Sequence, residues 1–183
     1  EGLLREYNWW ISARLHPSGL SQHGTHETGE GMERFADEKR VSRICPSEGK
    51  SRSEKRRIGA HYLAEAEGTC DFTPRFEKRC LDYVQTDLNG LLYDYERFFA
   101  EHSERLGWNF NIDWAARAEL RKERLNRYCW SEERGLFLDY DSLNDRHSSV
   151  AALTGVQLLM HGIPTEPQAA RIVSNLPLFE RDF

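Results

Sequence analysis

The sequence predicts an all-α fold. Apolar residues recur at three- and four-residue steps through most of the chain, which is the spacing of one buried helix face. Several of these stretches begin near a Ser, Thr or Asp that can cap a helix, and end at a Gly or Pro. Alternating apolar and polar residues, which are typical of strands, are nearly absent, so helices are expected to form the core.

The first expected helix covers residues 3–15, where the apolar residues share one face. Trp9 and Trp10 are adjacent and cannot both lie on that face, so one of them is expected to line a pocket. Residues 16–31 contain Gly, Pro, Ser and Thr at the density of a long loop.

Two more helices are expected at residues 32–44 and 58–67, separated by a charged connector. The stretch AEGTCDFTPRF, residues 66–76, then interrupts the helical pattern, because Gly68 and Pro74 break regular structure on both sides of one acid, Asp71.

The longest helix is expected at residues 86–107, with Thr86 or Asp87 as its cap and Gly107 at its end. Its predicted buried stripe consists of Leu88, Leu91, Leu92, Tyr95, Phe98 and Phe99.

The C-terminal part of the chain is expected to begin with a helix at residues 113–130, followed by a short extended segment or loop at 131–141. Ser148 is predicted to cap the next helix. Thr165 and Gln168 have capping-box spacing at the start of the last one. The whole chain is therefore expected to contain six to eight helices.

Length and composition limit the classes of function that the chain can have. With 183 residues the chain can form one domain with a real core, and a formal net charge of −5 gives no reason to expect a nucleic-acid partner. No apolar run approaches the roughly 20 residues of a membrane span. The four cysteines have no C-x-x-C spacing and are expected to be free thiols, which favours a reducing compartment and hence the cytoplasm. Nothing in the sequence indicates an oligomeric state.

Three acidic or histidine-containing stretches are candidates for a site. Asp71 beside Phe72 could be a general acid, because burial raises the pKa of a carboxyl group, or it could be a surface residue. Glu33 could bind a substrate, or it could be an acid in the first turn of a helix. His23 and its neighbours lack the spacing of a metal site, so no metal is expected, and His23 could instead bond a ligand hydroxyl.

Four stretches in the same order resemble the trehalase family of glycoside hydrolases. The segment AEGTCDFTPRF resembles the family signature A-E-S-G-W-D-F-S-S-R-W, and TDLNGLLYDYE resembles D-L-N-S-x-L-Y-x-x-E. The segment NRYCWSEERGLFLDYD resembles Y-L-W-x-E-x-x-G-x-F-x-D-Y-D, and residues 148–176 resemble the helix pair that follows it. The resemblance covers nearly the whole chain and is firmest from residue 64 to residue 176.

The resemblance implies part of an (α/α)6 toroid, the fold of six-hairpin glycosidases, that hydrolyses trehalose or a related α-glucoside with inversion and without a cofactor. The signature acid, and with it the role of general acid, corresponds to Asp71. Glu33 resembles a substrate-binding Glu of the family, and Arg75 matches a signature Arg whose role is expected to be structural more than catalytic. Together with His23, both are the candidates for substrate-binding residues. The expected partner is a small disaccharide, not nucleic acid or a membrane.

The sequence also departs from the family pattern. Thr69 and Cys70 replace the signature Gly-Trp, and LSQH replaces L-N-R-Y. The general base of the family lies beyond the last residue of this chain, and an N-terminal sugar-binding segment is missing. Residues 1–183 are therefore expected to be one partial domain that lacks its N- and C-terminal portions and is inactive alone. Two alternatives stay open: a non-catalytic or degenerate carbohydrate-binding homologue, and a helical interaction scaffold.

Overall fold

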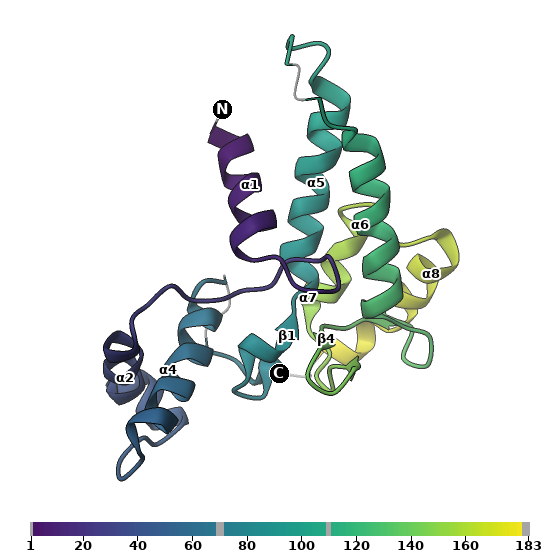
Figure 1. The fold of residues 1–183 in the computed structure, drawn as a ribbon. Coiled ribbons are helices and arrows are strands. Elements are labelled where there is room, and N and C mark those ends of the chain that lie inside the picture. Colours follow the sequence, from purple (N-terminus) through teal and green to yellow (C-terminus); the bar gives the residue numbers. More distant parts are fainter. Residues whose placement is uncertain (1, 69–71, 109–110, 181–183) are drawn as a thin grey trace.

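The computed structural model describes residues 2–68, 72–108 and 111–180 (Figure 1). Helices account for most of these residues, which confirms the predicted all-α class. The α-helices are α1 (Gly2–Ala13), α2 (Gly29–Asp37), α3 (Lys39–Ile44), α4 (Arg52–Ala66), α5 (Thr86–His102), α6 (Trp114–Cys129), α7 (Leu153–Val156) and α8 (Glu166–Ser174). The short 3-10 helices are η1 (Pro74–Phe76), η2 (Cys80–Asp82), η3 (Gln157–Leu159) and η4 (Leu176–Phe179).

Two helix pairs dominate the architecture. Figure 1 shows α5 and α6 side by side in opposite directions, with α1 along the other flank of α5. The second pair, α2 and α4, lies apart from them at the end of the loop that follows α1. The chain therefore passes from α1 to α2 across the base of α5, and this crossing segment brings His23 to the start of that helix.

Short strands of two residues each occur in the described part of the chain, and one group of them joins the base of α5 to the region after α6. The strand β1 (Tyr83–Val84) pairs antiparallel with β4 (Tyr140–Asp141), which pairs in turn with β5 (Arg146–His147). The strands β2 (Trp130–Ser131) and β3 (Leu136–Phe137) form a separate hairpin. These pairings confirm the extended segment predicted at residues 131–141 and hold residue 139 beside the N-terminus of α5.

Two of the apolar clusters among the described residues lie around α5, one large and one smaller. The larger one joins α5 and α6 to the strands and to α8; its buried members are Leu20, Val84, Tyr93, Ala118, Leu125, Cys129, Leu136, Phe137, Leu138, Leu158, Ile163 and Ile172. The smaller one lies between α1, α5 and α6 and contains Tyr7, Leu88, Leu92, Phe99 and Trp114. The apolar stripes read from the sequence therefore do converge, and α5 contributes to both clusters.

The two helices α2 and α4 approach so closely that only glycine fits at one position. A Cβ atom at Gly59 would clash with the carbonyl oxygen of Met32. Because Gly59 has no side chain, the backbones of the two helices can approach each other closely. This close approach explains a glycine inside a helix, where its propensity is poor.

Some local predictions are wrong. The N-cap residue of α5 is Gln85, and Asp87 lies in the first turn, where its carboxylate binds Arg75 instead of capping. Ser148 does not cap a helix: α7 begins at Leu153, and the Ser148 hydroxyl accepts from the Val150 N–H in a local turn. The capping box of Thr165 and Gln168 at α8 is confirmed.

One apolar position of the predicted stripe is exposed, and Tyr95 and Phe98 are half-buried. Leu91 is 54% exposed, whereas Leu88 and Leu92 are buried. Leu91 lies on the side of α5 that lines a cavity beside α1. None of the helices in the described ranges is long and apolar enough to cross a membrane.

Candidate functional site

A cavity of about 700 Å³ lies between α1, residues 87–98 of α5 and the end of α4. Its polar end is lined by His23, Glu67, Gly68 and Asp87, which come from three different segments of the chain. The remaining lining residues are Leu3, Glu6, Trp10, Leu88, Leu91, Leu92, Asp94, Tyr95, Phe98, Gln157 and His161. The cavity thus combines acidic groups at one end with an aromatic and aliphatic wall, which is the composition of a small-molecule site.

Trp10 provides an aromatic wall beside the polar end. Its ring lies edge-on to the ring of His23, with centroids 5.7 Å apart. Trp9, its neighbour in sequence, lies outside the cavity, with the Arg14 guanidinium 4.7 Å from its ring centroid. The expectation that one tryptophan of this pair lines a pocket is therefore confirmed for Trp10.

Glu67 is held in place by residues of the segment that leads from α1 to α2. Arg14 donates from Nε and Nη2 to the carboxylate, at 2.6–3.0 Å, and the Gly24 N–H donates to Oε2 at 2.7 Å. Burial raises the pKa of Glu67, but His23, Arg14 and the Gly24 N–H together outweigh it and lower the pKa to about 2. Glu67 is therefore ionised near neutral pH and is a hydrogen-bond acceptor, not a proton donor.

His23 lies between Glu67 and Asp87 and is only 6% exposed. Its Nδ1 is 3.6 Å from Glu67 Oε2, beyond hydrogen-bond distance, and among the described residues this buried nitrogen has no hydrogen-bond partner. An unsatisfied buried nitrogen costs free energy unless a ligand or water satisfies it. The imidazole also lines the polar end of the cavity.

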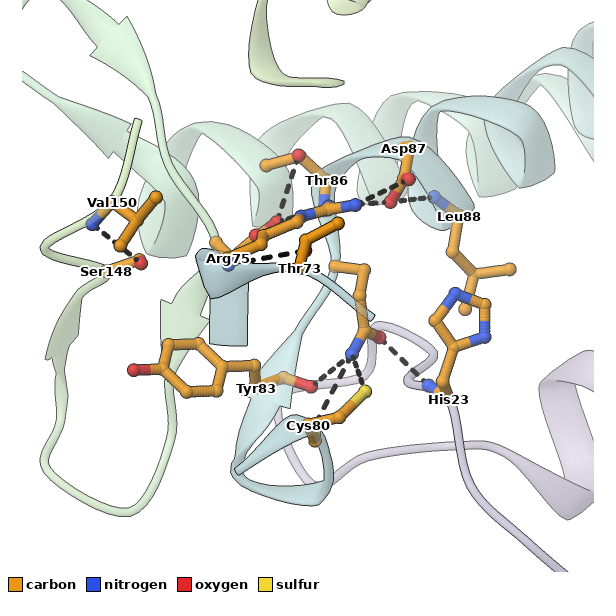
Figure 2. A network of polar contacts seen from close by, with 12 residues as sticks. His23, Thr73, Arg75, Cys80, Tyr83, Thr86, Asp87, Leu88, Ser148 and Val150 are labelled. Atoms are coloured by element: carbon orange, nitrogen blue, oxygen red, sulfur yellow. Dashed lines mark hydrogen bonds and ion pairs between the residues drawn. The ribbon is translucent and has the colours of Figure 1, made fainter. Parts of the chain in front are cut away.

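Arg75 lies behind the cavity wall, where it bridges two carboxylates (Figure 2). Its Nε and Nη2 donate to Asp139 at 2.7 and 2.8 Å, and its Nη1 and Nη2 donate to Asp87 at 2.8 Å each. Asp139 also accepts from the Thr86 N–H at 2.9 Å. The guanidinium therefore fixes the first turn of α5 against the segment that follows β3, and it has no side facing the cavity.

The Arg75 network gives the cavity a fixed negative charge. One guanidinium between two carboxylates leaves one negative charge in excess, and the side chain of Asp87 is 15% exposed while that of Asp139 is 2% exposed. Burial raises the pKa of Asp87, but the hydrogen bonds and positive charge of Arg75 outweigh it, so the pKa is lowered overall. Asp87 thus stays ionised and presents its charge to the cavity.

The far wall of the cavity carries a second histidine. His161 Nδ1 lies 2.6 Å from Asp94 Oδ2, and this pair joins the residues after η3 to the outer face of α5. The carboxylate of this pair is half exposed, since 49% of the Asp94 side chain is accessible. Within the described residues no group of three His, Cys, Asp or Glu side chains is placed to hold a metal ion.

The residues predicted from the sequence do not all meet at this cavity. His23 lines it, and Arg75 supports it from behind through Asp87. Glu33 lies elsewhere, on α2, where Arg52 and Arg56 of α4 donate to its carboxylate at 2.9 and 2.5 Å. Asp71 lies outside the described residues; of its neighbours in sequence, Gly68 lines the cavity.

Sequence reasoning missed Asp87 and assigned no role to Glu67. Asp87 was interpreted only as a helix cap, although the signal that could have identified it is its place in TDLNG, one of the stretches that resemble a family motif. Arg14, which holds Glu67, is 53 positions away in the chain, and Arg75, which holds Asp87, is 12 positions away, so neither pair has the three- or four-residue spacing that a helical pattern would indicate.

A family model described as trehalase matches residues 17–181. The chain belongs to the trehalase family. This confirms the resemblance inferred from the ordered motifs. The family match includes all of the polar end of the cavity, from His23 to Asp87, but not Trp10.

Curated relatives are fungal trehalases. The chain is 37% identical over 131 residues to the cytosolic neutral trehalase of Kluyveromyces lactis, an alignment covering 66% of this chain and 17% of that protein. It is 27% identical over 210 residues to the cytosolic neutral trehalase of Saccharomyces cerevisiae, covering 97% of this chain and 28% of that protein. The chain therefore spans between a sixth and a third of the length of these relatives.

Solved structures agree on the fold. The neutral trehalase Nth1 of Saccharomyces cerevisiae matches with a TM-score of 0.70 at 24% identity, over 94% of this chain and 37% of that chain. A GH63 mannosylglycerate hydrolase from Thermus thermophilus matches with a TM-score of 0.54 at 17% identity, over 96% of this chain and 46% of that chain. These likenesses confirm that this trehalase-family chain has the architecture of part of an (α/α)6 toroid.

Proposed function

We propose that the complete protein is an inverting trehalase-type glycosidase that releases glucose from trehalose or a related α-glucoside. The observation that carries this proposal is the convergence of His23, Glu67, Gly68 and Asp87 on one cavity in a chain of the trehalase family. The cavity offers charged acceptors for sugar hydroxyls and an aromatic ring, Trp10, for the apolar C–H surface of a sugar ring.

The charges of the cavity support a division of roles among its acids. Arginines hold Glu67 and Asp87 in the ionised state, which suits them to orient hydroxyl groups and prevents them from donating a proton near neutral pH. The proton donor is therefore a different group, and we assign that role to Asp71, the acid of the family signature. We assign the substrate contact to His23, whose imidazole lines the polar end of the cavity and can bond a hydroxyl.

The reaction needs a second carboxylate on the opposite face of the sugar. In our proposal Asp71 protonates the glycosidic oxygen while a base, supplied by sequence that the family carries after the region matched here, deprotonates the attacking water. Inversion requires the two carboxyl groups to be about 6.5–9.5 Å apart, which leaves room for that water. Residues 1–183 would then be one part of the catalytic domain.

Replacing the proposed proton donor tests the proposal. We expect Asp71→Asn in the complete protein to lower kcat for trehalose by about a hundredfold or more, because general acid catalysis contributes about 10²–10⁴-fold. The measurement is glucose release, with the anomer of the first product followed by NMR. Glucose release at the wild-type rate by this variant would rule out Asp71 as the acid.

The departures from the family signature favour a second candidate, a carbohydrate-binding homologue without turnover. Thr69 and Cys70 replace the signature Gly-Trp next to the proposed acid. This candidate predicts heat of trehalose binding in calorimetry but no glucose release by the complete protein. A scaffold without sugar chemistry predicts that Asp71, Glu33 and His23 lie far apart on the surface. His23 is buried at the cavity, whereas Glu33 lies apart on α2 and Asp71 lies outside the described residues. We propose a cytosolic location because the relatives are named cytosolic neutral trehalases.

A further inference from the structure

The segment that carries His23 into the cavity has no strand beside it. Residues 22–28 have no regular secondary structure, and Ser21 forms only an isolated bridge to Leu15. Ser21 and His23 are nevertheless buried, at 0% and 6% exposure. Buried backbone groups need hydrogen-bond partners, so side chains must supply those that a neighbouring strand would otherwise provide.

Asn89 of α5 supplies the partners for Ser21. Its Oδ1 accepts from the Ser21 N–H at 2.9 Å, and its Nδ2 donates to the Ser21 carbonyl oxygen at 2.8 Å. Both backbone groups of one residue are thus bound by one amide, as a residue of a neighbouring strand would bind them. The Asn89 amide is itself fixed, because Nδ2 also donates to the Gln85 carbonyl and Oδ1 also accepts from Arg121 Nη1.

Gln85 supplies the partner for His23. Its Oε1 accepts from the His23 N–H at 2.9 Å, and its Nε2 donates to the Tyr83 carbonyl at 2.9 Å. Figure 2 shows this bond to the His23 backbone in the same region as the Arg75 network. Gln85 is the N-cap residue of α5 and is fully buried, so its amide has a fixed position at the helix start.

The spacing of these two amides matches the spacing of an extended chain. Residues four apart on a helix are about 6 Å apart along its axis, and alternate residues of an extended segment are about 6.6–6.8 Å apart. Gln85 and Asn89 therefore bind His23 and Ser21 as two rungs of a ladder. The intervening Gln22 faces the other way and donates its N–H to the Arg14 carbonyl oxygen.

We propose that Gln85 and Asn89 are positioning residues that set the register of this segment and so place His23, not Gln22, in the cavity. A slip of one residue would exchange the two side chains, as in a strand. The inference deepens the proposed function and rests on it where substrate is concerned, because its consequence is the placement of a substrate-binding imidazole. Neither residue lines the cavity.

The test uses Gln85→Met in the complete protein, which keeps the side-chain length but leaves the His23 N–H without an acceptor. We expect KM for trehalose to rise about tenfold, because a lost buried hydrogen bond misplaces the imidazole, while kcat changes less. His23→Ala should raise KM as well. If Gln85 acts through His23, the double variant will have the KM of His23→Ala alone.

Two further variants separate positioning from stability. Gln85→Glu keeps an acceptor for the His23 N–H and loses the donor to Tyr83, so it should lower the melting temperature but leave KM within about twofold. If Gln85→Met does not fold, the KM of Gln85→Glu still tests the positioning role. Asn126→Ala is the matched control: its amide joins α6 to Gln168 of α8 and lines no part of the cavity, so it should affect the melting temperature and not KM.

A readout without catalysis keeps the inference separate from the proposed function. The imidazole NMR signals of His23, assigned with His23→Ala, should shift in Gln85→Met and not in Asn126→Ala. Wild-type protein that neither hydrolyses nor binds trehalose would refute the proposed function, and the NMR comparison would then decide the positioning role. Unchanged His23 signals, additive KM effects, or a Gln85→Glu variant as impaired as Gln85→Met would overturn the inference.

Discussion

At the scale of single residues, the cavity depends on arginines that do not face it. Arg14 holds Glu67 and Arg75 holds Asp87, and in both pairs the carboxylate is the partner that reaches the cavity. A bidentate guanidinium both orients a carboxylate and keeps it ionised. The two acids are thereby prepared to accept hydrogen bonds from hydroxyl groups at no further ordering cost.

Removing Arg75 should be far more costly than removing an exposed arginine. We expect Arg75→Met to lower the free energy of unfolding by about 3–5 kcal/mol, because it leaves Asp87 and Asp139 as uncompensated buried charges. Urea unfolding followed by circular dichroism measures this. Arg56→Met, which breaks the pair with Glu33 on the surface of α4, is the control and should leave the curve nearly unchanged. Equal losses in the two variants would contradict the role given to Arg75.

Glu67 should give the protein a stability that is lost in acid. Its pKa in the folded protein is about 2, against an ordinary value of 4.5, so the folded state favours the ionised form. The contribution is therefore fully present above pH 4.5 and is lost as the pH falls towards 2.

Glu67→Gln should flatten the fall of unfolding free energy across this pH range, and urea titrations at a series of pH values measure it. Glu54→Gln is the comparison. Glu54 lies at the exposed capping box of α4, where the N–H and hydroxyl of Ser51, not an arginine, donate to its carboxylate. A Glu67→Gln protein with the same pH dependence as the wild type would show that the Arg14 contact does not stabilise the ionised form.

At the scale of elements, the contact between α2 and α4 depends on a single missing side chain. Gly59→Ala would place a Cβ atom against the Met32 carbonyl, and relieving that clash requires the two helices to move apart. Overpacking costs about 1–3 kcal/mol and the better helix propensity of Ala returns at most about 1 kcal/mol. We therefore expect a net loss of about 1–2 kcal/mol in unfolding free energy.

Thermal and urea unfolding of Gly59→Ala measure this loss, with Gly2→Ala as the matched control. A Cβ atom at Gly2 would have open space around it, so the same substitution there should have little effect. If Gly59→Ala is as stable as the wild type, the helices can separate freely and their close approach contributes little to the fold.

The sequence predicted where most helices lie better than it predicted the contacts between them. Thr165 and Gln168 marked the start of α8 correctly, because a capping box is a local arrangement. Asp87 was misinterpreted as a cap because its partner, Arg75, is brought to it by tertiary packing, and Ser148 because its hydroxyl accepts from the Val150 N–H in a turn that precedes α7. The family resemblance directed attention to the right segments, and the ladder of Gln85 and Asn89 could be identified only from coordinates.

At the scale of the whole molecule, one face of the described chain is unusually apolar. The wall formed by Leu3, Leu91, Tyr95 and Phe98 lies between α1 and α5, and Leu3 and Leu91 are 42% and 54% exposed. The relatives are several times longer than this chain. Contiguous exposed apolar surface usually marks a place where other protein packs.

We therefore expect a protein made only of residues 1–183 to associate through this wall. Light scattering after gel filtration should show species larger than a 21.4 kDa monomer, and Leu91→Glu should reduce them because a charge opposes apolar association. Leu143→Glu is the matched control, since Leu143 is 68% exposed but lies in the turn between β4 and β5, away from the wall. A monomer with a single cooperative melt would contradict this expectation, and it would mean that α1 and α5 bury enough surface to be stable without further protein against them.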